Sequence, residues 1–144
     1  MDVIEAFSVT VWLICASVQD IRHRRLHPAM LIIGAGISLW IAIYGCLHGE
    51  RILPVVAGAI PGVLFWWLGH ITRCIGSADG IVLTIIGICV DWKKTVVVWL
   101  ISMFLIGVGA MVYVVWKPES RRKKLPYIPF LTIAFAVYFM CGGQ

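Results

Sequence analysis

The sequence predicts an all-α, polytopic integral membrane protein with about six transmembrane helices, and three observations support this prediction. The 144-residue chain is 61% hydrophobic with a mean hydropathy of +0.97, far outside the composition of soluble globular domains. Only 13% of its residues are charged. Apolar tracts of the length that a helix needs to cross hydrocarbon alternate with short polar breaks. Because no charged stretch is long enough for a separate soluble module, residues 1–144 are expected to form a single membrane-embedded domain.

Six apolar segments are expected to be the helices. In order, they are Val3 to Gln19, Ala29 to Leu47, Ile52 to Ile71, Gly80 to Val90, Thr95 to Trp116 and Tyr127 to Cys141. The fourth segment holds only 11 residues, and a helix of that length covers roughly half of the membrane thickness. One end of the fourth helix is therefore expected to lie below the lipid surface.

Basic residues in the breaks predict the topology. Nine of the 12 Lys and Arg residues fall in the first, third and fifth breaks, among them the run from Lys117 to Lys124. The positive-inside rule then places these breaks in the cytoplasm and both termini outside. A net charge of +5 could suggest nucleic acid in a soluble protein, but here it reports topology. The expected partner is the lipid bilayer, and no nucleic acid is expected.

The cysteines indicate no metal site and no redox pair. All five are widely spaced, and no CxxC pair occurs. Zinc sites and redox dithiols need thiols at short spacing. We therefore expect neither a metal nor a cofactor.

The acidic residues identify candidate catalytic groups by elimination, because ionisable residues near membrane depth are costly. Five of the seven are explained by solvation, since they fall on the outer side or in the basic fifth break: Asp2, Glu5, Glu50, Asp91 and Glu119. Asp20 ends the first expected span, and Asp79 opens the short fourth one. Both carboxylates are therefore expected on the cytoplasmic side.

Two nearby carboxylates can share one proton, because like charges resist double ionisation. The ionised member can activate water while the neutral one donates a hydrogen bond to a carbonyl, which is the chemistry of aspartic proteolysis. The position of Asp79 at a helix start favours its ionised form, whereas Asp20 at a helix end is expected to hold the proton. A purely structural alternative stays open: Asp20 pairs with a nearby arginine, and Asp79 caps its helix.

Three segments resemble the type IV prepilin peptidases, which are aspartyl proteases of the inner membrane. Residues 75–80 (IGSADG) resemble the GxGD motif of that family, with Gly76, Ser77, Ala78 and Gly80 around Asp79. Residues 20–28 (DIRHRRLHP) are similar to its first-aspartate segment. Residues 125–131 (LPYIPFL) resemble the Pro-Phe-x-Pro-Phe sequence before the last helix, through Pro126 and Pro129.

The chain also departs from the family pattern. Ala78 stands at the second glycine, as in archaeal preflagellin peptidases, and Ile81 replaces a common lysine. His27 and Pro28 replace Pro-Asn. The two aspartates are intact, and the six spans come in the same order.

The resemblance implies an aspartic endopeptidase with Asp20 and Asp79 as its catalytic residues. Its substrate would be a prepilin or pseudopilin, with a basic leader cut at the cytoplasmic face of the inner membrane. Because Asp20 follows a single span and no CxxC is present, we expect a short form without the methyltransferase region. A different class of function stays open, namely a noncatalytic membrane assembly protein or a small cation-coupled carrier. The sequence leaves the oligomeric state open.

Overall fold

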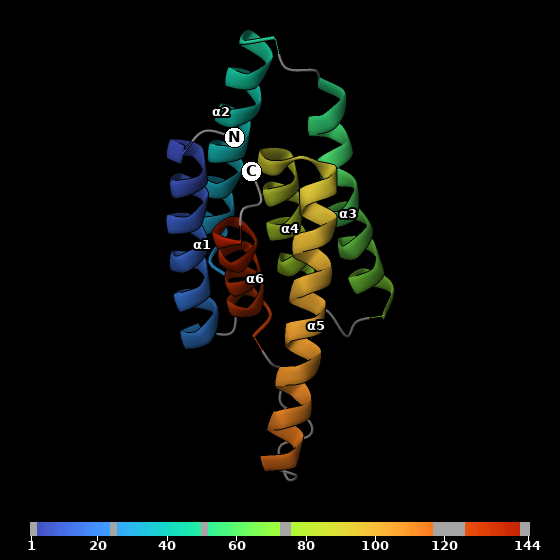
Figure 1. The fold of residues 1–144 in the computed structure, drawn as a ribbon. Coiled ribbons are helices and arrows are strands. Elements are labelled where there is room, and N and C mark those ends of the chain that lie inside the picture. The colour runs from blue at the N-terminus through green and yellow to red at the C-terminus, as the bar shows by residue number, and fades with distance from the viewer. Residues whose placement is uncertain (1–2, 24–25, 50–51, 73–75, 117–125, 142–144) are drawn as a thin grey trace.

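The computed structural model describes residues 3–23, 26–49, 52–72, 76–116 and 126–141, and the regular structure in this part of the chain is entirely helical. The helices are α1 (Val3–His23), α2 (Pro28–Leu47), α3 (Ile52–Thr72), α4 (Ser77–Val90), α5 (Trp92–Trp116) and α6 (Ile128–Met140). Successive helices run in alternating directions in one bundle (Figure 1). The predicted all-α fold with six helices is confirmed.

Four helices are long and apolar enough to cross a membrane: α1, α2, α3 and α5. The other two, α4 and α6, are apolar but hold only 14 and 13 residues, about 20 Å of helix each. Large apolar side chains point outward along the long helices, such as Leu39 at 62% exposure and Phe104 at 71%. Because lipid is the solvent that such a surface requires, the chain is a multi-pass membrane protein.

Two helix boundaries differ from the prediction in ways that affect the aspartates. Helix α1 continues to His23 rather than ending at Gln19, so Asp20 lies inside its final turns. Arg22 and His23 in the last turn favour this extension, since positive charge is stabilising at a helix C-terminus. Helix α4 begins at Ser77, which places Asp79 in its first turn.

The polar residues at two other helix starts explain where those helices begin. Helix α5 begins at Trp92 rather than Thr95, because the Asp91 carboxylate accepts the Trp92 backbone N–H at 2.7 Å. The His27 side chain accepts the backbone N–H of Ala29 at 3.4 Å and caps α2. Much of the predicted basic surface lies outside the described residues, including Arg24, Arg25, Arg73 and the run from Lys117 to Lys124.

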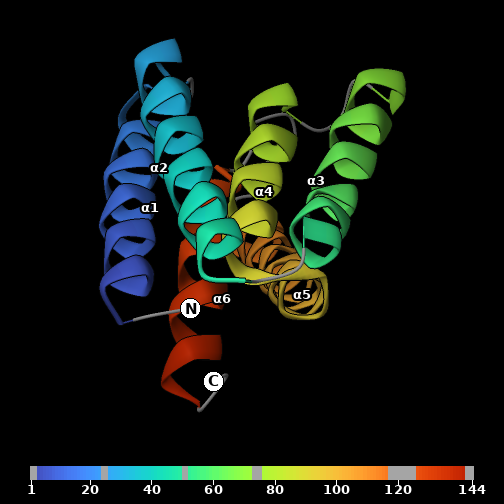
Figure 2. The same ribbon diagram turned by 90° about the horizontal axis from the view of Figure 1, so that it is seen from above.

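Helix α4 lies inside the bundle, where it packs against α1, α2, α3 and α5. Figure 2 shows it between α2 and α3. The tightest contact is with α3, because a Cβ atom added at Gly58 would meet the carbonyl oxygen of Gly87, and one added at Gly87 would meet that of Gly58. One turn further along α3, a Cβ at Gly62 would meet the backbone of Thr84. Only glycine lets the two backbones approach this closely.

Helix α6 packs against α1 and α5. Its Leu131 and Phe135 side chains are fully buried. The Thr132 hydroxyl is 3.3 Å from the carbonyl oxygen of Leu13 in α1. The first and last helices of the described chain are thereby held side by side.

The glycine contact predicts a position-specific loss of stability. Gly87→Ala should lower the free energy of unfolding by about 1 to 3 kcal/mol, since the new methyl group forces α3 and α4 apart. Gly107→Ala is the matched control, because a Cβ there meets nothing within 4 Å and alanine favours a helix by about 1 kcal/mol over glycine. Thermal unfolding in detergent, followed by tryptophan fluorescence, measures both. Wild-type stability in Gly87→Ala would contradict the close backbone contact.

Candidate active site

Asp20 is the more deeply buried of the two candidate aspartates. Its side chain is 8% exposed, and its carboxylate accepts a hydrogen bond from the backbone N–H of Ile128. The Oδ2 atom of the same carboxylate is buried with no hydrogen-bond partner in the described part of the chain. A buried polar atom without a partner is costly and needs an explanation. A shared proton or a bound substrate group would satisfy this oxygen.

The hydrogen bond from Ile128 also changes the helix-polarity argument. The sequence places Asp20 at the negative C-terminal end of its own helix, with Arg22, Arg24 and Arg25 acting in the opposite direction. In the structure its carboxylate also meets the N-terminal end of α6, where backbone N–H groups favour negative charge. Both carboxylates therefore lie near the N-terminal end of a helix, α6 for Asp20 and α4 for Asp79, and helix polarity alone does not distinguish them.

Asp79 lies in the first turn of α4 and is half-buried. Its backbone N–H donates to the carbonyl oxygen of Gly76, the N-cap residue, at 3.1 Å. Its side chain folds back over Gly76, because a Cβ atom added there would lie 2.9 Å from Asp79 Oδ2. The glycine of the motif thus leaves the space that this carboxylate occupies.

The remaining motif residues shape the surroundings of the aspartates. Gly80 is buried against α3, since a Cβ atom there would lie 2.5 Å from the Cα of Trp66. Ala78 is half-buried, and Ser77 is the first residue of α4. Pro126 precedes α6 and Pro129 lies in its first turn, where a missing backbone N–H costs nothing.

The start of α6 connects the two aspartates, and the sequence did not reveal how. Tyr127 is 5% exposed, and its hydroxyl lies 2.7 Å from the Ser102 hydroxyl of α5. The Ser102 hydroxyl is also 2.7 Å from the carbonyl oxygen of Trp99, and either hydroxyl of the Tyr127–Ser102 pair can act as the donor between them. The only available signal was a tyrosine at a phenylalanine position of the resembled motif, and a serine inside an apolar run.

The chemistry around Tyr127 keeps its phenol neutral. Burial raises the pKa of Tyr127, and the negative charge of Asp79 raises it further, while the hydrogen bond with Ser102 acts in the opposite direction. The ring of Phe65 from α3 packs on the phenol with centroids 5.4 Å apart. Asp79 therefore acts electrostatically on Tyr127, and Asp20 is bonded to the next residue, Ile128.

The arrangement places two carboxylates at the same end of the bundle, one in the final turns of α1 and one in the first turn of α4 (Figure 1). Among the described residues, no group of three or more His, Cys, Asp or Glu side chains could hold a metal ion. Two carboxylates can give and accept protons, which is the chemistry of general acid–base catalysis.

Fold and site together define a multi-pass helical membrane protein with an acidic pair at one end. The sequence profile of the type IV leader peptidase family matches residues 7–111, and the chain belongs to this family. It is therefore a peptidase of the leader peptidase kind. No curated protein and no solved structure matches the chain significantly. The matched range includes Asp20 and Asp79, whereas α6 lies beyond it.

The neutral phenol predicts a pH dependence of stability. The folded pKa of Tyr127 lies above the ordinary value of 10.0, so the unfolded chain loses this proton first. The contribution of this proton to the free energy of unfolding is complete below about pH 10. Above that pH the contribution is lost, by up to about 1.4 kcal/mol per pH unit. Tyr127→Phe should lower stability at pH 7 by about 1 kcal/mol and reduce the loss above pH 10. Melting temperatures of wild type and variant from pH 7 to 11 measure this, and equal alkaline losses would contradict it.

Proposed function

We propose that this chain is an aspartic endopeptidase, with Asp20 and Asp79 as its catalytic pair, that removes the basic leader from prepilin-like proteins. The observation that carries the proposal is the buried Oδ2 atom of Asp20, which has no partner among the described residues. Family membership supports peptide hydrolysis as the reaction. A purely structural aspartate would be expected to use both of its oxygens.

The mechanism divides the work between the two carboxylates. Asp79 is the ionised member, because it is the less buried aspartate and burial disfavours the charged form of a carboxylate. It takes a proton from the attacking water. Asp20 holds the proton that is donated to the scissile carbonyl oxygen as the tetrahedral intermediate forms. The backbone N–H of Ile128 bonds the same carboxylate and restricts how it can turn.

The proposed substrate has a basic leader followed by a hydrophobic helix. Such a helix can stay in the lipid beside the bundle while the leader lies in water. The first turn of α4, which holds Asp79, lies above the lower ends of α3 and α5 in Figure 1. This position favours a scissile bond held near the membrane surface. The positive-inside rule supports the cytoplasmic face, with both termini on the outer side of the inner membrane.

The central prediction is loss of cleavage on neutral substitution of either aspartate. Asp20→Asn and Asp79→Asn should each lower prepilin cleavage by at least about a hundredfold, because an amide cannot carry the proton cycle. The control is Thr10→Val, a similarly isosteric change on α1, at a hydroxyl that donates to the Ala6 carbonyl oxygen of its own helix at 2.7 Å. Membrane insertion is quantified for all three variants, and cleavage is read as a mobility shift of prepilins from the same genome.

The outcomes separate the proposed classes. Near wild-type cleavage by either Asn variant would contradict the catalytic pair. Failure of the inserted wild-type protein to cut any of those prepilins would favour the noncatalytic assembly protein or the cation-coupled carrier.

Proton sharing predicts the shape of the pH–rate curve. If the active form carries one proton on two carboxylates, the rate falls on both sides of an optimum, as the pair becomes fully protonated or fully ionised. Initial rates of prepilin cleavage across the pH range in which the bundle stays folded measure this curve. A flat curve would contradict the shared proton.

A further inference from the structure

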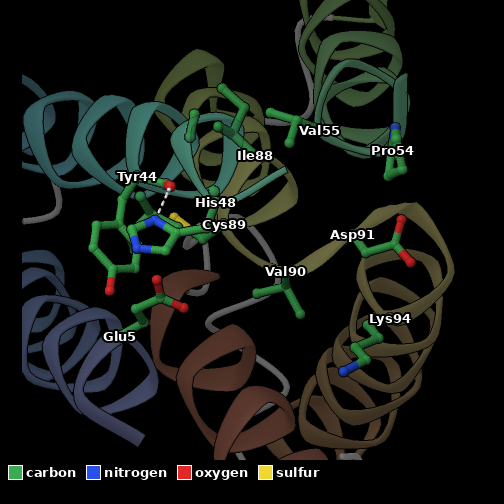
Figure 3. Close-up of a pocket in the computed structure, with 13 residues that line it drawn as sticks. Glu5, Tyr44, His48, Pro54, Val55, Ile88, Cys89, Val90, Asp91 and Lys94 are labelled. Atoms are coloured by element: carbon green, nitrogen blue, oxygen red, sulfur yellow. Dashed lines mark hydrogen bonds between the residues drawn. The ribbon is translucent and has the colours of Figure 1, made fainter. Parts of the chain in front are cut away.

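A recess lies at the end of the bundle opposite the aspartates. It has a volume of about 520 Å³ and is formed by the start of α1, the end of α2, the start of α3, the end of α4 and the start of α5 (Figure 3). Neither Asp20 nor Asp79 lines it. The polar and charged side chains that do are Glu5, Tyr44, His48, Asp91 and Lys94. Peptide hydrolysis at the other end of the bundle uses none of them.

One side of the recess is suited to a cation. Figure 3 shows the Glu5 carboxylate below the paired rings of Tyr44 and His48. The two rings are tilted by 33° with centroids 4.1 Å apart, and the His48 Nδ1 atom lies 2.9 Å from the Tyr44 carbonyl oxygen. Glu5 is also within electrostatic range of the Cys89 thiol, which lines the same recess. A carboxylate beside aromatic rings favours an ammonium group.

The opposite side is suited to an anion. Lys94 lies in the first turn of α5 and is half-buried, and Figure 3 shows it across Val90 from Glu5. Its neighbour Asp91 caps α5, because the Asp91 side chain accepts the Trp92 N–H and its carbonyl oxygen accepts the Thr95 N–H at 3.0 Å. A lysine beside the N-terminal end of a helix favours a phosphate group.

The floor of the recess is apolar, with Ile41, Val55 and Ile88 contributed by α2, α3 and α4. Helices α2 and α3 continue past the end of α4 at this side of the bundle (Figure 1). Trp92, the first residue of α5, is 46% exposed, and exposed tryptophans are typical of the membrane–water interface. The recess therefore has charged groups at headgroup depth and an apolar floor below them.

We propose that this recess binds one phospholipid whose headgroup joins a primary ammonium to a phosphodiester, as in phosphatidylethanolamine. The ammonium group binds Glu5 below the Tyr44 ring, the phosphate binds Lys94, and an acyl chain follows the apolar floor between α2 and α3. The two described carboxylates and single lysine of the lining disfavour a headgroup with net negative charge. A primary ammonium is favoured over choline, because only its N–H groups donate to the Glu5 carboxylate.

The test measures lipid retention and is independent of peptidase activity. Wild-type protein is placed in nanodiscs with equal parts of phosphatidylethanolamine, phosphatidylcholine and phosphatidylglycerol, and the lipids that it retains are counted by native mass spectrometry. Phosphatidylethanolamine should be enriched. Lys94→Gln and Glu5→Gln should each weaken its retention by about tenfold, the loss of one charge-assisted hydrogen bond.

Lys93→Gln is the matched control, because it removes the same charge from the adjacent, exposed residue outside the recess. It should retain phosphatidylethanolamine as wild type does. Thermal unfolding in detergent identifies any variant that fails to fold. If Glu5→Gln fails to fold, Lys94→Gln alone tests the site. Equal retention of the three lipids, a preference for phosphatidylglycerol, or an equal loss in Lys93→Gln would overturn the proposal.

Discussion

The close approach of the α3 and α4 backbones is the constraint on which the rest of the structure depends. Lipid supplies no hydrophobic force between helices, so packing must hold them together. Gly58 against Gly87, and Gly62 against Thr84, bring the two backbones into close contact. Helix α4 is too short to fix its own depth in a bilayer. Its contact with α3 sets that depth, and with it the position of Asp79.

The N-terminal end of α6 is the second fixed point, because it is shared by groups from three other helices. Its first backbone N–H, on Ile128, holds Asp20 of α1. The adjacent Tyr127 is bonded to Ser102 of α5 and experiences the charge of Asp79 on α4. A shift of α6 would therefore disturb both carboxylates together. The acidic end of the bundle depends on a helix that lies beyond the family match.

The sequence was sufficient for features that depend on local composition. Apolar length predicted six helices and a short fourth one, and charge pointed to Asp20 and Asp79. It was insufficient for contacts between distant segments. The extension of α1 past Asp20, the bond from Ile128 and the hydroxyl pair of Tyr127 with Ser102 arise only when α1, α5 and α6 pack. The catalytic assignment of the aspartates stays a prediction, since it concerns a reaction rather than a packing arrangement.

The length of α5 has a consequence for the membrane around the protein. Its 25 residues extend about 37 Å, more than the hydrocarbon thickness of about 30 Å, and its far end passes below the other helices (Figure 1). Met111, Val115 and Trp116 near that end are 73%, 73% and 81% exposed. Such hydrophobic mismatch is relieved by helix tilt or by local thickening of the bilayer. Because α3, α4 and α6 pack on α5, a tilt of α5 also moves the acidic end of the bundle. The acyl-chain length of the surrounding lipids then adjusts how far Asp79 lies from water.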